Sequence, residues 1–323
     1  MSETKNEKRG IAYLFPGQGS QAVGMGRELY EKYAEARQVF EEADWALGFP
    51  LTRLIFEGPE DALRLTENTQ PAILTMSVAA ARVLAAKGVR PAMTAGHSLG
   101  EYSAHVAAGT LTFADAVRTV RKRGQFMQAA VPVGEGAMAA VLGMAAEKVI
   151  EICRIVAEET GEVVSAANLN SPEQVVISGG ATAVERAAER AKEGGAKRAV
   201  MLPVSAPFHC ALMQPAEDQL AEELATVEFE DPLLPVVSNV DAVVVGTAAA
   251  AEDALVRQVT GAVRWVECVE RLKGMGATEW VEVGPGRVLS GLLRQIDRGL
   301  FAHAGNVEDE ASLEKALALV GGK

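Results

Sequence analysis

The stretch "PAMTAGHSLGEYSA" constrains the fold more than any other segment, because a short apolar run ends there in a serine between two glycines. Gly96, Ser98 and Gly100 fit the pattern G-x-S-x-G, which turns a strand into a helix and projects the serine from the turn. Glycines are needed where backbone segments approach too closely for a Cβ atom. A tight turn with a solvated serine would show the same letters, so a catalytic and a purely structural interpretation both stay open.

Strand and helix patterns alternate along most of the chain. Apolar runs predict short strands at 11–15 and within 91–96, 233–239 and 278–284. Helical spacing of apolar residues predicts helices at 26–47, 69–87, 99–108, 112–130, 263–273 and 288–296. This alternation indicates an α/β domain with a parallel sheet.

The pattern changes between Gly134 and Ser205. Strands are predicted at 137–143, 163–170, 174–180 and 197–205, and helices at 145–159 and 181–194. The resulting order, β-α-β-β-α-β, is that of ferredoxin-like folds. We therefore expect a large α/β subdomain over 1–133 and 206–323, with a small ferredoxin-like subdomain over 134–205 inserted into it.

Composition excludes several classes of function. A net charge of −12 argues against nonspecific nucleic-acid binding, because the phosphate backbone favours basic surfaces. The apolar runs are too short to span a membrane, and "MSETKNEKRG" lacks an apolar signal core, which predicts a cytoplasmic protein. Cys153 and Cys268 stand alone, without a CxxC pair that would suggest zinc. No phosphate-binding glycine motif is present, so we expect neither a cofactor nor a metal.

A serine nucleophile needs a base, and the chain has only four histidines. His97 adjoins the serine and its side chain should project elsewhere, His105 lies two turns along the next helix, and His303 falls in a polar C-terminal tail. His209, in "PVSAPFHCALMQP", follows a proline-rich turn, a placement typical of residues that loops deliver to active sites. Alone it would more often be a capping or core histidine, but beside a serine elbow the base is favoured. Cys210 is a rival nucleophile that no elbow presents.

Five motifs, in order over about residues 11–296, carry a family resemblance. They are "FPGQGSQ" at 15–21, "GHSLGEYSA" at 96–104, "RG" at Arg123, "APFHCALM" at 206–213 and "VEVGPGRVLSGL" at 281–292. Together they resemble the malonyl-CoA:acyl carrier protein transacylases of fatty acid synthesis. The resemblance implies a hydrolase-like large subdomain with a ferredoxin-like insertion, in agreement with the reading of the periodicity.

The resemblance also implies a ping-pong acyl transfer. Ser98 would attack the thioester of malonyl-CoA, and the phosphopantetheine thiol of acyl carrier protein would then collect the malonyl group. His209 would act as general base and then as acid. The oxyanion hole would be the backbone N–H groups of Leu99 and Gln18. No Asp or Glu is clearly marked as the partner of His209; the family orients its histidine through a backbone carbonyl near the residue that matches Gln258.

Arg123 matches the arginine with which the family holds the malonyl carboxylate, because a guanidinium can hold a carboxylate with two parallel bonds. From the residues alone it would be one cation of a solvated cluster. Phe208 resembles the bulky residue of relatives that prefer malonyl over methylmalonyl. Asn168 matches an asparagine that lines the family's cleft, and could equally be a turn residue. His97 is a supporting residue beside the nucleophile.

Three alternatives stay open. A serine esterase or thioesterase would use the same Ser98 and His209, but would not need a buried Arg123. A noncatalytic scaffold that binds the carrier protein would never retain an acyl group, and a polyketide pathway would use the same chemistry. An acidic carrier protein needs a locally basic docking surface, for which Arg287, Arg294 and Arg298 are candidates.

Overall fold

A mostly parallel sheet forms the centre of the large subdomain in the computed structural model, which describes residues 10–204 and 206–321. Its strand order is β10-β9-β1-β2-β7-β8, with only β8 antiparallel to its neighbour. The strands are β1 (Ile11–Phe15), β2 (Met93–Gly96), β7 (Val236–Val237), β8 (Val244–Val245), β9 (Glu279–Val283) and β10 (Ala304–Val307). Phe15 pairs with Gly96, so β1 and β2 end at the same edge of the sheet.

Helices cover both faces of this sheet. They are α1 (Arg27–Lys32), α2 (Ala34–Leu47), α3 (Leu51–Glu57), α4 (Glu60–Arg64), α5 (Thr66–Ala86), α6 (Gly100–Ala107), α7 (Phe113–Ala129), the 3-10 turn η1 (Ala211–Met213), α10 (Gln214–Leu224), α11 (Ala248–Arg257), α12 (Trp265–Gly274), α13 (Val288–Ile296), α14 (Arg298–Phe301) and α15 (Glu310–Val320). None of the helices in the described ranges is long and apolar enough to cross a membrane.

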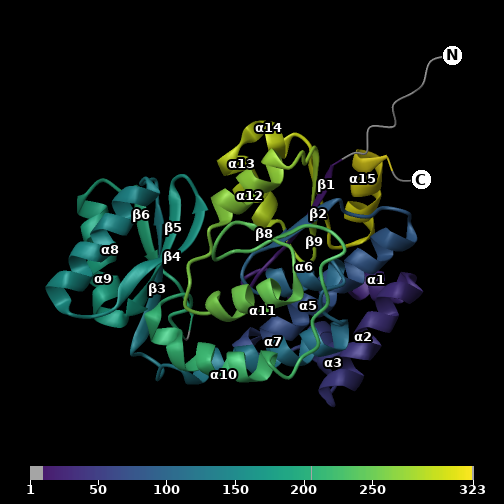
Figure 1. Ribbon diagram of the computed structural model, residues 1–323, viewed down its shortest axis with the longest axis horizontal. Helices are drawn as coiled ribbons and strands as arrows, with labels where there is room; N and C mark the ends of the chain where they lie inside the picture. Colours follow the sequence, from purple (N-terminus) through teal and green to yellow (C-terminus); the bar gives the residue numbers. More distant parts are fainter. Residues whose placement is uncertain (1–9, 205, 322–323) are drawn as a thin grey trace.

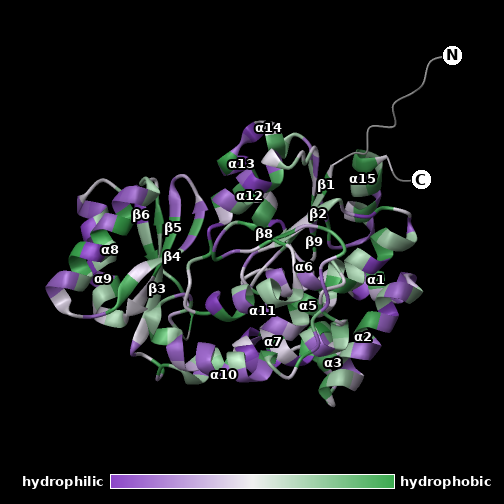
Figure 2. Ribbon diagram, viewed as in Figure 1, coloured by the Kyte–Doolittle hydropathy of each residue, from purple (hydrophilic) through white to green (hydrophobic). Residues whose placement is uncertain are grey.

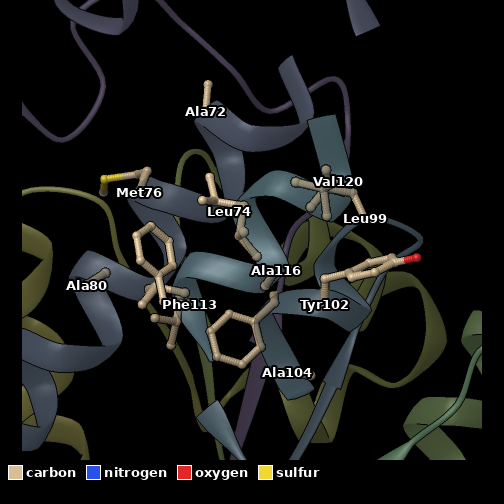
Figure 3. Packing of buried hydrophobic residues seen from close by; sticks show 14 of the residues in the cluster. Ala72, Leu74, Met76, Ala80, Leu99, Tyr102, Ala104, Phe113, Ala116 and Val120 are labelled. Carbon is tan, nitrogen blue, oxygen red and sulfur yellow. The ribbon is translucent and has the colours of Figure 1, made fainter. Parts of the chain in front are cut away.

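The alternation of β1 explains the two layers. Tyr13 and Phe15 face the larger core, with residues of α2, α5, α6 and α7, whereas Ala12 and Leu14 face a second core with α12 and α13. Because both faces are covered, the strand is apolar throughout. Figure 3 shows Tyr102 of α6 and Phe113 of α7 within the larger core. The result is a rigid sheet whose carboxyl edge can hold a site.

The small subdomain lies to one side of this sheet (Figure 1). It comprises β3 (Gly136–Leu142), α8 (Ala146–Thr160), β4 (Val164–Ser171), β5 (Gln174–Gly180), α9 (Ala181–Glu193) and β6 (Arg198–Met201). The strands pair antiparallel in the order β4-β5-β3-β6, the ferredoxin-like arrangement. Hydrophilic stretches mark α8 and α9 in Figure 2. The predicted fold class is therefore confirmed.

The structure differs from the sequence-based prediction in several details. The helix predicted at 26–47 is divided, because Tyr33 is extended, with φ −118°, and ends α1. The strand predicted at 197–205 ends at Met201, two residues before Pro203, which cannot donate to a sheet; its last residue, 205, lies outside the described residues, as does the polar leader at 1–9. His303 does not lie in a polar tail: its carbonyl accepts from the N–H of Trp280, and β10 and α15 follow it.

Candidate active site

The elbow at Ser98 joins β2 to α6 in the way the motif predicts. Ser98 has φ +51°, which is uncommon for any residue other than glycine. A Cβ atom on Gly96 would lie 1.9 Å from the backbone of Gly100, and one on Gly100 would lie 2.1 Å from the carbonyl oxygen of Phe15. Both glycines are therefore required, because they let β1, β2 and α6 meet directly at the serine.

Ser98 and His209 come together across the cleft. The Ser98 Oγ lies 2.7 Å from His209 Nε2. His209 Nδ1 lies 2.9 Å from the carbonyl oxygen of Gln258 and 3.2 Å from that of Gly261. A carbonyl can only accept, so Nδ1 carries the proton and Nε2 is left to accept from the serine hydroxyl. The expected carbonyl at Gln258 is thus found, and the two groups at Nδ1 are carbonyls rather than carboxylates.

Burial keeps His209 neutral. Its side chain is buried, and burial together with the positive charge of Arg123 lowers the pKa of the imidazole to about 3. A neutral imidazole can accept a proton from Ser98, whereas an imidazolium could not. The backbone of His209 has φ +60°, a strained conformation for a residue other than glycine, and the loop after Pro207 holds it there.

Arg123 lies inside the site and not in a solvated cluster. Its side chain is 1% exposed, and its Nη2 donates to Ser98 Oγ at 3.2 Å and to Gln258 Oε1 at 2.9 Å. Its Nη1 donates to Gln70 Oε1 at 2.8 Å. These described partners are neutral, so no carboxylate contacts the guanidinium, and burial lowers the pKa of the guanidinium. A buried cation beside the serine that no described carboxylate contacts can hold an anionic group.

The neighbours of Arg123 on α7 point elsewhere. Arg121 donates to Asn68, and its guanidinium stacks on the ring of Phe49. The other two cations form ion pairs at the surface, Arg118 with Asp115 and Lys122 with Glu223. Only the residue on the inward face of the helix reaches the serine.

A cleft of about 210 Å³ lies between the two subdomains, over the serine. Leu99, at the start of α6, and Gln18, in the loop after β1, both line it. A Cβ atom on Gly17 would lie 2.4 Å from the carbonyl oxygen of His97, so this loop passes directly over the elbow. The two residues expected to form an oxyanion hole thus lie at the same end of the cleft as the serine.

The small subdomain supplies one wall of the cleft. Asn168 lines it from β4, and Phe208 lines it from the loop that returns to the large subdomain. His97 also lines the cleft; its Nε2 lies 2.8 Å from Oδ1 of Asn170, and burial lowers the pKa of its ring. Asn170 was not predicted from the sequence. It connects the residue beside the serine to the small sheet.

Three other buried polar residues complete the site and were not predicted. Asn239, directly after β7, accepts the N–H of Ser98 on its Oδ1 at 2.6 Å. Glu101, in the first turn of α6, accepts from Gln258 Nε2 at 2.6 Å. Gln70 lies near the start of α5, after the polar residues 66–69, so nothing in the sequence marks it out from its neighbours. Each is joined to the rest of the site by contacts between segments distant in sequence, which local patterns do not reveal.

The rival residues lie outside the cleft. Cys210 is buried, its Sγ donates to the Pro207 carbonyl at 3.1 Å, and burial raises the pKa of the thiol. His105 is buried within α6, away from the serine. Neither residue lines the cleft. Among the described side chains, the geometry therefore leaves Ser98 as the nucleophile that has a base.

Comparison with known proteins places this geometry in a family. The model of the acyl transferase domain matches residues 12–312. A Bacillus subtilis protein named malonyl CoA-acyl carrier protein transacylase is 52% identical over 307 residues, 95% of this chain and 96% of the relative. The crystal structure of an acyl carrier protein S-malonyltransferase from Vibrio cholerae is 50% identical with a TM-score of 0.92, covering 95% of this chain and 99% of that one.

A further solved structure is described as a type II PKS acyl-carrier protein in complex with its malonyl-transacylase. It is 48% identical to this chain, has a TM-score of 0.92, and covers 95% of this chain and 99% of its own. The similarity extends over both subdomains.

Proposed function

This chain belongs to the acyl transferase family, and we propose that it moves a malonyl group from malonyl-CoA to the phosphopantetheine thiol of acyl carrier protein in fatty acid biosynthesis. The reaction is an S-malonyl transfer through a malonyl-serine. The observation that carries the choice of substrate is Arg123. This buried cation lies 3.2 Å from the nucleophile, and its hydrogen-bond partners among the described residues are all neutral.

In the loading step, Ser98 Oγ attacks the thioester carbon of malonyl-CoA while His209 Nε2 takes the hydroxyl proton. The carbonyl oxygen becomes an oxyanion, which we assign to the backbone N–H groups of Gln18 and Leu99. Collapse of this intermediate breaks the carbon–sulfur bond. CoA leaves as its thiol with the proton from His209, and the malonyl group remains as an ester on Ser98.

In the transfer step the roles repeat in the opposite direction. His209 takes the proton of the phosphopantetheine thiol, whose sulfur attacks the malonyl ester. The bond to Ser98 Oγ breaks and His209 returns the proton to that oxygen. The Gln258 carbonyl keeps the imidazole in the required tautomer throughout, although a carbonyl stabilises imidazolium less than a carboxylate would.

Arg123 distinguishes this transferase from an esterase. The malonyl group carries a free carboxylate, and its binding would replace the neutral amide contacts of the guanidinium with a charge-assisted pair. An acetyl group would leave the cation unpaired. The bulky side chain of Phe208 would leave too little room in the cleft for a branched acyl group. Asn168 and His97 would line the cleft walls.

We further propose that the enzyme works in the cytoplasm. We also propose that it needs no cofactor, since the described side chains supply a nucleophile, a base and a receptor for the anionic group. Loading with radiolabelled malonyl-CoA, with and without carrier protein, tests the function. We expect label on the enzyme that moves to the carrier protein. Release of free malonate at the same rate in both samples would favour the esterase, and an enzyme that never retains label would favour the scaffold.

The entrance beside α13 is the proposed docking surface for the acidic carrier protein. Val288 and Leu292 of α13 line the cleft, and Arg287, Arg294 and Arg298 lie on or next to this helix with exposed side chains. Replacing the three arginines together by glutamate should raise the KM for carrier protein roughly tenfold, because like charges then oppose docking. Loading from malonyl-CoA should not change. An unaltered KM for the carrier protein would discard this surface.

A further inference from the structure

Glu101 is a fully buried carboxylate under the elbow that the reaction itself does not use. It is 0% exposed and lies three residues after Ser98. Its Oε2 accepts from the backbone N–H of Asn239 at 3.0 Å and from Gln258 Nε2 at 2.6 Å. A buried carboxylate is costly unless it is hydrogen-bonded. These two contacts satisfy Oε2, whereas Oε1 has no hydrogen-bond partner among the described groups.

Both partners of Glu101 hold the backbone of Ser98. Asn239 accepts the N–H of Ser98 on Oδ1, and Gln258 Nε2 donates to the carbonyl oxygen of Ser98 at 3.1 Å. The peptide groups on either side of the nucleophile are thereby fixed, although its φ of +51° is strained. The Glu101 carboxylate therefore holds both residues, Asn239 and Gln258, that bind the backbone of Ser98.

Glu101 also determines which way the Gln258 amide faces. Gln258 Oε1 accepts from Arg123 Nη2 at 2.9 Å, while its Nε2 donates to Glu101. A guanidinium can only donate and a carboxylate can only accept. A reversed amide would set N–H against N–H at one end and oxygen against oxygen at the other. The two charges at the ends of the amide therefore select a single orientation.

We propose that Glu101 is a positioning residue for acyl selectivity: through Gln258 it holds Arg123 where the guanidinium meets the malonyl carboxylate, and through Asn239 and Gln258 it holds the elbow. The inference rests on the proposed function. Burial raises the pKa of Glu101 to about 7, although hydrogen bonds from Gln258 and Asn239 and the charge of Arg123 act to lower it. Assays at pH 8 therefore test the ionised form of Glu101.

The test compares Glu101→Met with Glu101→Gln at pH 8. Rates of acyl-enzyme formation are measured separately with malonyl-CoA and acetyl-CoA by quenched intact-mass analysis. Glu101→Met keeps the volume but removes the acceptor, and we expect the malonyl-to-acetyl ratio of rates to fall roughly tenfold or more. Glu101→Gln can still accept both bonds on its amide oxygen and should retain most of the ratio.

Two further variants separate positioning from general disruption. Ser103→Ala alters another buried residue of α6 whose hydroxyl has no hydrogen-bond partner among the described groups, and should behave as wild type. In an Arg123→Ala background, Glu101→Met should hardly change the ratio, because its effect runs through the guanidinium. Gln258→Met removes the amide that joins Glu101 to Arg123 but leaves Glu101 in place, so it should also lower the malonyl-to-acetyl ratio. This variant keeps the proposal testable if Glu101→Met fails to fold.

The outcomes distinguish the inference from the function on which it rests. A wild-type ratio in Glu101→Met or in Gln258→Met, or an equal fall with and without Arg123, overturns the positioning role. A wild-type enzyme that forms no malonyl adduct at all overturns the proposed function and this inference with it.

Discussion

The two subdomains bury different kinds of side chain. The core of the small subdomain is apolar, built from residues such as Val141, Val156 and Ile177. In the large subdomain the charged groups Arg123 and Glu101 are buried, together with two histidines, His105 and His209, that burial keeps neutral. Buried charges give up hydration and lower stability unless every one is hydrogen-bonded. The large subdomain therefore carries the chemistry at a cost in stability, whereas the small one, built on an apolar core, supplies one wall of the cleft.

The largest effect on activity should come from removing the base, His209, of the large subdomain. His209→Ala leaves no group to take the serine proton, and we expect malonyl loading to slow by roughly 10³-fold. Rapid-quench measurement of acyl-enzyme formation checks this. Cys210→Ala, which changes the next residue but not the cleft, is the matched control and should load normally. Loss of loading in the cysteine variant alone would reverse the assignment of the nucleophile.

The second effect concerns selectivity. Arg123→Ala removes the cation that faces the acyl group, and the preference for malonyl-CoA over acetyl-CoA should fall about 100-fold, from the loss of hydrogen bonds between charged groups. Arg121→Ala, on the same helix but directed at Asn68 and Phe49, should keep the preference. Equal losses in both variants would mean that α7 was merely distorted.

A smaller effect appears in the pH dependence of stability. Burial lowers the pKa of His105 to about 3, and neither ring nitrogen has a hydrogen-bond partner among the described residues. The unfolded chain binds a proton at this histidine below about pH 6.5 and the folded chain does not, so stability falls on acidification. His105→Leu should therefore lose about 1 kcal/mol less than wild type between pH 7.5 and 5.5.

Urea denaturation at the two pH values measures this difference. The nearest carboxylate, Glu101, lies 4.0 Å from His105 Nε2 and is unchanged in the variant. Parallel curves for wild type and His105→Leu would show that the histidine is protonated in the fold and contradict the prediction.

The smallest effect tests the small subdomain. Ile177→Val deletes one buried methylene from its apolar core and should cost about 1 kcal/mol of unfolding free energy. Malonyl loading at 25 °C should not change, because Ile177 belongs to the core of the small subdomain and does not line the cleft. Thermal denaturation checks the loss of stability, and the loading assay checks that the activity is unchanged. A clear loss of loading would show that the two subdomains are more tightly coupled than their separate cores suggest.

Local patterns in the sequence were enough to predict the elbow, the pair of Ser98 and His209, and the order of strands and helices along the small subdomain. They did not predict the strand order of the large sheet. They could not place Arg123, because helical spacing gives its direction relative to Arg121 but not which direction faces the core. Asn239 and Glu101 also escaped prediction: their contacts with the elbow and with Gln258 join segments far apart in the chain. Strand β10 was missed because it is short and its residues are small.

The most direct measurement of the central claim is the intact mass of wild type and of Ser98→Ala after brief exposure to malonyl-CoA or to acetyl-CoA. The account predicts a malonyl adduct on wild type only, with little acetyl adduct. A malonyl adduct that persists in Ser98→Ala would contradict it and move the nucleophile elsewhere, with Cys210 next in line.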